Sequence, residues 1–321
     1  MLRARAVCLA VFALGLPVAA WAQDSTPKDV TPKDAPPKAS TAADHGAPMP
    51  PPDPALIFQD YLKTAEDGDP QAQGRVGDMY AHGDGVDQNM DQARVWDERA
   101  AEAGIAAAQA NLGQLYELGH GTEVDYATAR VWYERAADQG HAGALYSLGV
   151  MYDKGEGMPA DTAKAAQYYR QAAERGDPDA QYALGLMYGH GDGVPQDDRI
   201  AADWLYRAAN QGRGDAQYEL GLRYLTGRGV IQNEASAYSW FMSAAQQGDA
   251  DAEFQLVKMY DLGRGIPRDP LRAYAWAFLA ASAGNKNAQD YIVSVQADLT
   301  PAQKAGAINM ADTLATPRAG K

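Results

Sequence analysis

Cysteine is almost absent from this 321-residue sequence, in which Cys8 is the single example. One thiol excludes a disulfide framework, a cysteine-ligated zinc site and a Cys-X-X-Cys redox pair. Cationic residues are also scarce, because 28 lysines and arginines stand against 42 aspartates and glutamates, giving a formal charge of -14. Charge of this sign is repelled by phosphate backbones and anionic lipid surfaces. The composition therefore disfavours nucleic acid and membrane surfaces as partners.

Residues 1–22 differ from the rest of the sequence. Arg3 and Arg5 precede an apolar run, which ends in a small-x-small triplet at Ala22. This order predicts a secretory signal peptide cleaved after Ala22, and hence a periplasmic or secreted protein. A transmembrane anchor is the alternative, but the run is shorter than the roughly 20 residues that span a bilayer. We expect no direct membrane insertion after cleavage, which would also remove Cys8.

Residues 23–54 are rich in proline and poor in large apolar side chains. Proline removes a backbone donor and fixes φ, and a segment without large apolar side chains cannot form a core. The composition therefore predicts a disordered linker with polyproline II character. A docking peptide for a proline-reading groove is the alternative, although the segment lacks a distinctive PxxP register.

From residue 68 onward the sequence repeats every 36 residues without insertion or deletion. Glycines, alanines and tyrosines recur at this spacing of 36 residues. The glycines are Gly68, Gly104, Gly140, Gly176, Gly212, Gly248 and Gly284, and the tyrosines are Tyr80, Tyr116, Tyr152, Tyr188, Tyr224 and Tyr260. Fixed periods of this length indicate a stacked repeat architecture.

Each unit predicts two helices, as residues 177–212 illustrate. Asp177 and Pro178 have the order of an N-cap and a first-turn proline, and a Gly-x-Gly pair that begins at Gly191 ends this helix. Asp197 then caps a second helix, which continues to the end of the unit. An isolated helix of about 12 residues is marginal in water. Each αα-hairpin is therefore expected to depend on stacking against its neighbours.

A glycine occupies the middle of the first helix in five of the six units. These glycines are Gly77, Gly113, Gly149, Gly185 and Gly221. Mid-helix glycine costs on the order of 1 kcal/mol relative to alanine. We therefore expect close helix approach, with the ring of a neighbouring Trp or Tyr in the groove. Val257 takes this position in the last unit.

Strings such as AQYALGLMYGHGDGVPQDDRIAADWLYRAANQG, at 180–212, resemble Sel-one-like repeats, which are relatives of tetratricopeptide repeats. Six full units over 69–284 match this pattern, whereas 55–68 resemble a second helix alone and 285–321 resemble capping helices with a tail. The resemblance implies an all-α, right-handed superhelical solenoid of αα-hairpins, capped at both ends. It also implies that the first helices line the concave side.

The same resemblance implies a protein-interaction scaffold, and exported bacterial members tend to be envelope regulators or assembly adaptors. We therefore expect a non-enzymatic adaptor of the bacterial cell envelope that uses no cofactor. Some cysteine-rich relatives are credited with β-lactam binding or hydrolysis, so a cell-wall or β-lactam-directed enzyme is one alternative, although this chain lacks their cysteines. A secreted effector that uses the same surface is the other alternative.

No pattern in the sequence predicts catalytic residues or metal ligands. His82 and His190 begin identical HGDG strings, but three units of a solenoid separate them, so they are not expected to share an ion. The helical serines lack a Gly-x-Ser-x-Gly elbow. Asp197 and Asp198 form a carboxylate pair, which we interpret as favourable charge at a helix start.

The first helices also predict a partner-binding surface, made of the positions that point away from the core toward the concave side. Its predicted residues are Tyr146, Val150, Asp179, Tyr182, Leu186, Asp215, Tyr218, Leu222, Asp251 and Phe254. Aromatic residues bordered by carboxylates would suit a protein or peptide partner, such as an envelope protein with apolar anchors and basic flanks. The alternative, which the regular period favours, is that each aromatic leans onto the adjacent first helix and is mostly buried.

Overall fold

A computed structural model of the protein describes residues 53–315. The predicted signal peptide over 1–22 and most of the predicted linker over 23–54 lie outside the described residues. Within 53–315 the chain forms 15 helices and no strand. The helices are α1 (Pro54–Glu66), α2 (Pro70–His82), α3 (Met90–Glu102), α4 (Ala106–Leu118), α5 (Tyr126–Asp138), α6 (Ala142–Lys154), α7 (Thr162–Glu174), α8 (Pro178–His190), α9 (Asp198–Asn210), α10 (Gly214–Thr226), α11 (Glu234–Gln246), α12 (Ala250–Leu262), α13 (Pro270–Ser282), α14 (Lys286–Val295) and α15 (Pro301–Ala315).

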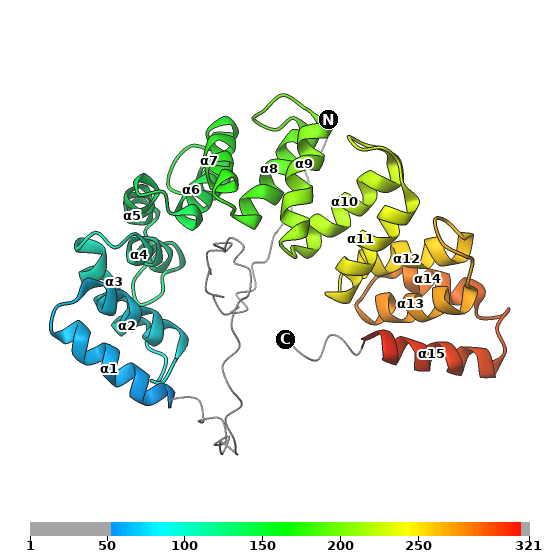
Figure 1. The fold of residues 1–321 in the computed structure, drawn as a ribbon, viewed down its shortest axis with the longest axis horizontal. Coiled ribbons are helices and arrows are strands. Elements are labelled where there is room, and N and C mark those ends of the chain that lie inside the picture. The colour runs from blue at the N-terminus through cyan, green and yellow to red at the C-terminus, as the bar shows by residue number, and fades with distance from the viewer. Residues whose placement is uncertain (1–52, 316–321) are drawn as a thin grey trace, which may run out of the picture. The chain divides into compact units, whose positions relative to one another are not determined.

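Six helix pairs, from α2 with α3 to α12 with α13, form six consecutive repeats, and Figure 1 shows them following one another in chain order. Each first helix packs against the second helix of its own repeat and against the helix before it, which is α1 for the first repeat and the second helix of the preceding repeat for the others. This pattern of neighbour contacts is that of an α-helical solenoid, and it confirms the predicted fold class. None of the helices between residues 53 and 315 is long and apolar enough to cross a bilayer.

The ends of the helices are fixed by local sequence signals. Each second helix begins after an aspartate or asparagine whose side chain accepts a hydrogen bond from a first-turn N–H. These caps are Asn89, Asp125, Asp161, Asp197, Asn233 and Asp269. Each first helix ends at a glycine with φ between 69° and 81°, a conformation that strains other residues. Because the signals recur with the period, all twelve repeat helices have 13 residues.

The mid-helix glycines of the first helices allow close packing inside each repeat. A Cβ added at Gly113 would lie 2.7 Å from the ring of Tyr133, and one at Gly149 would lie 2.6 Å from the ring of Tyr169. The expected aromatic filler is therefore a tyrosine in repeats two and three. The prediction of a Trp or Tyr ring is wrong for the other three glycines, because the side chains that fill those grooves are Asp97, Leu205 and Phe241.

Repeat six uses the opposite arrangement of sizes. Val257 stands where the other first helices have glycine, and Ala277 stands where they face a larger side chain. Both residues are buried in one hydrophobic cluster. The volume lost on one helix is thus supplied by the other, which keeps the packing density of the repeat.

Buried glutamines link neighbouring repeats. The Gln181 side chain donates from Nε2 to the Ala173 carbonyl at 3.1 Å and accepts from Gln211 Nε2 at 2.8 Å. The same pair of bonds recurs at Gln109 with Ala101 and Gln139, and at Gln217 with Ala209 and Gln247. Because buried amides are costly unless paired, these bonds fix the register between repeats.

The two ends of the stack are covered differently. At the N-terminal end, Phe58 and Ala65 of α1 are buried against the first repeat. At the C-terminal end, α14 and α15 both pack on α13, and Ala307 and Ala311 of α15 join its core cluster. These helices cover apolar surfaces that a further repeat would otherwise have to cover.

Candidate functional site

The ten residues predicted to bind a partner lie on α6, α8, α10 and α12, and we call them the first-helix face. None of the ten is fully buried. Asp215 and Asp251 are exposed, and the other eight are half-buried. The face therefore spans repeats three to six, with apolar side chains that are packed in part and two of its three carboxylates exposed to solvent.

Two aromatic residues of the first-helix face lean on the second helix of their own repeat. The Tyr146 ring centroid lies 5.6 Å from that of Tyr169, and the Tyr218 centroid lies 5.9 Å from that of Phe241. Tyr169 and Phe241 are the side chains that fill the glycine grooves. The alternative prediction, that each aromatic leans onto the adjacent first helix, stays a prediction, and the Tyr218 hydroxyl also has a hydrogen bond with Gln255 of α12.

Arg213 binds three residues of this face, and sequence reasoning missed it. Its guanidinium carbon lies 4.6 Å from the ring centroid of Tyr182, in cation–π geometry. Its Nη1 pairs with the Asp179 carboxylate, and its Nη2 lies 3.3 Å from Asp215 Oδ2. One arginine at the N-cap position of α10 therefore joins first-helix carboxylates of repeats four and five.

Repeats five and six keep an excess of negative charge at the same edge. The side chain of Asp249 accepts from the Ala252 N–H at 2.7 Å and caps α12. Burial raises the pKa of Asp249, and the nearby Asp251 and Asp215 carboxylates raise it further. Asn285 donates its Nδ2 to Asp251 Oδ1 at 2.8 Å. Asp249 is therefore repelled by both of the other carboxylates.

A second group of carboxylates lies at the C-terminal ends of α4 and α6. Burial raises the pKa of Glu117, which accepts a hydrogen bond from the Tyr133 hydroxyl at 2.6 Å. Burial also raises the pKa of Asp153, and Asp192 of the next repeat adds to the shift. The first helices therefore carry acidic groups at both ends, which adds to their negative potential.

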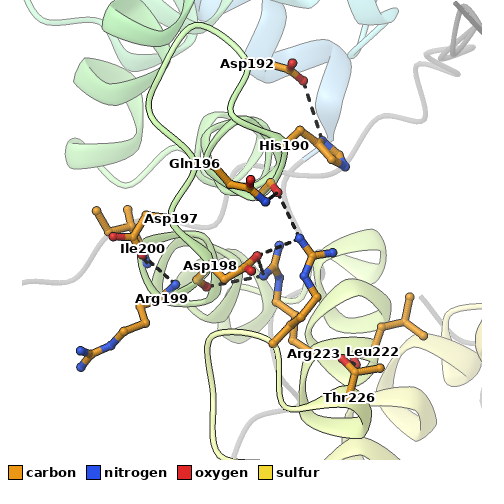
Figure 2. A network of polar contacts seen from close by, with 12 residues as sticks. His190, Asp192, Gln196, Asp197, Asp198, Arg199, Ile200, Leu222, Arg223 and Thr226 are labelled. Atoms are coloured by element: carbon orange, nitrogen blue, oxygen red, sulfur yellow. Dashed lines mark hydrogen bonds and ion pairs between the residues drawn. The ribbon is translucent and has the colours of Figure 1, made fainter. Parts of the chain in front are cut away.

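A buried arginine joins repeats four and five away from the first-helix face. Arg223 takes a core position at which the other repeats have Met79, Leu115, Met151, Met187 and Met259. Its Nη1 donates to Asp198 Oδ1 at 3.1 Å, and Figure 2 shows the two side chains pointing toward each other. Arg228 pairs with the same oxygen at 2.9 Å. Asp198, interpreted from sequence as a helix-start charge, is thus also the anion between two arginines.

This ion-pair cluster gives a prediction about stability. We expect Asp198→Ala to lower the free energy of unfolding by about 1–3 kcal/mol, because it leaves the buried Arg223 guanidinium without its carboxylate. Arg223→Met restores the side chain typical of the position, so it is expected to be near neutral. Urea denaturation followed by circular dichroism measures both effects.

A matched control for this prediction is Asp192→Ala. Asp192 lies 3.9 Å from His190, and both side chains are exposed. An exposed pair contributes little to stability, so Asp192→Ala should leave the denaturation midpoint unchanged. Equal effects of Asp192→Ala and Asp198→Ala would show that burial of Arg223 does not depend on its partner.

The described residues hold no group of three or more His, Cys, Asp and Glu side chains that could bind a metal ion. The two HGDG histidines have separate neighbours, because His82 Nδ1 lies 2.8 Å from the Asp78 carbonyl and His190 Nδ1 lies 3.9 Å from Asp192 Oδ2. The candidate functional site is the first-helix face, where aromatic, aliphatic and acidic side chains lie along four repeats.

The chain matches the model of the Sel1 repeat in six consecutive segments, at 70–105, 106–141, 142–177, 178–212, 214–249 and 250–285. It is similar to the crystal structure of a Sel1 repeat protein from Oxalobacter formigenes, with 34% identity and a TM-score of 0.59 over 72% of this chain and 97% of that one. It is also similar to a protective antigen of uropathogenic Escherichia coli with an SLR fold, with 27% identity and a TM-score of 0.55 over 83% of this chain. The match spans 65% of that antigen's length. No curated protein matches the chain.

Proposed function

The chain belongs to the Sel1 repeat family, and from this premise we propose that it is a non-enzymatic scaffold that binds a protein partner through its first-helix face. The observation that carries this proposal is the run of half-buried aromatic and aliphatic side chains along four repeats. Tyr146, Tyr182, Tyr218 and Phe254 recur at one position of the first helix. A solenoid presents such a repeated column to an extended partner as one continuous surface.

We also propose that this partner belongs to the bacterial cell envelope. The order of positive, apolar and small residues before Ala22 supports export, and the acidic borders of the first-helix face support a partner with basic flanks. In this proposal the apolar side chains supply most of the affinity, and the carboxylates supply orientation and speed of association.

Capture of the partner from a crosslinked periplasmic fraction tests the proposal. Leu186 and Leu222 lie between the aromatic positions and are half-buried. We expect Leu186→Ser with Leu222→Ser to reduce capture at least tenfold, because the change removes apolar anchors from the centre of the face. The captured protein is quantified by mass spectrometry against the wild-type chain.

The control variant replaces apolar side chains with serine at one second-helix position and one loop position. Tyr206 and Ile231 are exposed at 49% and 91%, so Tyr206→Ser with Ile231→Ser removes apolar surface outside the first-helix face. Capture should then remain at the wild-type level. Equal capture by both double variants, with both still folded by circular dichroism, would contradict binding through the first helices.

A further inference from the structure

Repeat four holds an arginine side chain in a cradle of three first-helix residues. The Tyr182 ring lies under the Arg213 guanidinium, and Asp179 and Asp215 pair with its two terminal nitrogens. An aromatic face with a carboxylate on each side suits a planar guanidinium, which stacks and donates in a fork. Arg213 therefore shows which ligand this arrangement accepts.

Repeat five keeps the cradle and lacks the arginine. One period after Tyr182 stands Tyr218, and one period after Asp179 and Asp215 stand Asp215 and Asp251. The position of Arg213 is taken by Asp249. The ring and both carboxylates are thus repeated, and the residue that fills the cradle from within the chain is replaced by a third carboxylate.

The charges of repeats five and six act on Tyr218, whose hydroxyl has a hydrogen bond with Gln255 of α12. Burial raises the pKa of the Tyr218 hydroxyl, and the negative charges of Asp251 and Asp249 act in the same direction. The pKa of Asp249 is raised by burial and by its two aspartate neighbours. The partners of the three carboxylates are mostly neutral, because Asp249 accepts from a backbone N–H and Asp251 from the Asn285 amide. Asp215 pairs with Arg213, at 3.3 Å between Oδ2 and Nη2.

We propose that Tyr218, Asp215, Asp249 and Asp251 form a receptor for an arginine side chain on the protein partner. The proposal rests on the proposed function and adds the chemistry of one contact. The guanidinium stacks on Tyr218 and pairs with carboxylates, as Arg213 does on Tyr182. A cation here relieves the repulsion among three carboxylates, and stacking selects arginine over lysine.

The probe for this receptor is a fluorescein-labelled peptide of sequence Leu-Arg-Leu-Arg-Leu with blocked ends. Its affinity for the wild-type chain is measured by fluorescence anisotropy. Peptides with citrulline or lysine in place of arginine keep the length and the apolar residues. We expect the citrulline peptide to bind at least tenfold more weakly and the lysine peptide about threefold more weakly. Equal binding of all three peptides would overturn the proposal.

The variant Asp249→Arg tests the location by building the repeat-four arrangement into repeat five. The new side chain is expected to occupy the cradle and to reduce probe affinity at least tenfold. Asp177→Arg is the matched control, because Asp177 caps α8 as Asp249 caps α12, with the same 2.7 Å bond. Both variants change the net charge equally, but repeat three has Gly143 where the cradle needs a carboxylate. Equal losses of probe affinity in both variants would show that the effect comes from net charge alone. The proposed site would then be wrong.

The two proposals can fail separately. If Leu186→Ser with Leu222→Ser abolishes partner capture and Asp249→Arg leaves it unchanged, the scaffold proposal stands and the arginine receptor is wrong. If Asp249→Arg abolishes probe binding while neither variant alters partner capture, the cradle binds arginine but the first-helix face is not the docking surface. Loss of capture in both variants, with Asp177→Arg unaffected, supports both proposals.

Discussion

Gly221→Val is expected to lower the free energy of unfolding by about 3 kcal/mol or more. A Cβ at Gly221 would lie 2.6 Å from Phe241 Cε1, far inside van der Waals contact. Phe241 is fully buried, so its ring has no solvent-filled space into which it could move. The added side chain therefore forces α10 and α11 apart in the middle of repeat five.

The effect of Gly221→Val should be rescued by a second change. Phe241→Ala alone leaves a cavity and is expected to cost about 3–5 kcal/mol. The double variant Gly221→Val with Phe241→Ala copies the pair Val257 and Ala277, which the chain itself uses in repeat six. We expect a favourable coupling energy of about 2 kcal/mol or more between the two substitutions. Urea denaturation of the four proteins of the cycle measures it.

The control for this cycle is Gly306→Ala on α15. A Cβ at Gly306 meets no atom within 4 Å, so alanine should gain up to about 1 kcal/mol from its helix propensity. If Gly221→Val is as harmless as Gly306→Ala, or if the two substitutions in repeat five add without coupling, the groove does not limit the approach of the helices.

Repeat one is expected to lose stability as the pH rises from about 4 to 8, because of Asp97. This side chain is 1% exposed and fills the groove at Gly77, where repeats two to five place a ring or a leucine. Burial raises the pKa of Asp97 to about 8, and the Asp78 carboxylate adds to the shift, while a hydrogen bond with Asn111 opposes it. The folded chain thus keeps a proton that the unfolded chain releases near its ordinary pKa of 3.8.

Between these two pKa values the folded state binds more protons than the unfolded state, so the free energy of unfolding falls as the pH rises. The slope reaches at most about 1.4 kcal/mol per pH unit, and it levels off above the folded pKa. Terminal repeats open before the rest of a solenoid, so the loss should concentrate in α2 and α3. Hydrogen exchange of these helices at several pH values measures it.

Asp97→Leu should remove this pH dependence and stabilise repeat one. The substitution copies repeat four, where Leu205 faces Gly185 in the same groove. Asp97→Asn is the matched control, because it removes the ionisation and adds no apolar contact. It should flatten the pH profile without the gain in stability at low pH. Protection in α2 and α3 that falls equally in wild type and Asp97→Leu would assign the pH dependence to other carboxylates.

Most of the fold follows from local signals that repeat along the sequence. The Asp and Asn caps and the glycines at helix ends act within a few residues, so their period predicts helix length and pairing. The mid-helix glycines predicted close helix approach. The sequence alone could not identify Asp97 and Leu205 as the side chains that fill the grooves, because the side chain that faces each glycine depends on how the two helices rotate about their axes.

The candidate site was also predicted only in part from the sequence. The period placed Tyr146, Tyr182, Tyr218 and Phe254 on one face, because equal spacing gives equal positions in every repeat. The pairing of Arg213 with Asp179 joins residues 34 positions apart, and that of Arg223 with Asp198 joins residues 25 apart. These contacts depend on the offset between stacked repeats and on where a long side chain finds room. The sequence by itself therefore determined the repeating solenoid and the residues along its first helices, and only the tertiary structure decided which charges meet, because that is set by packing between repeats.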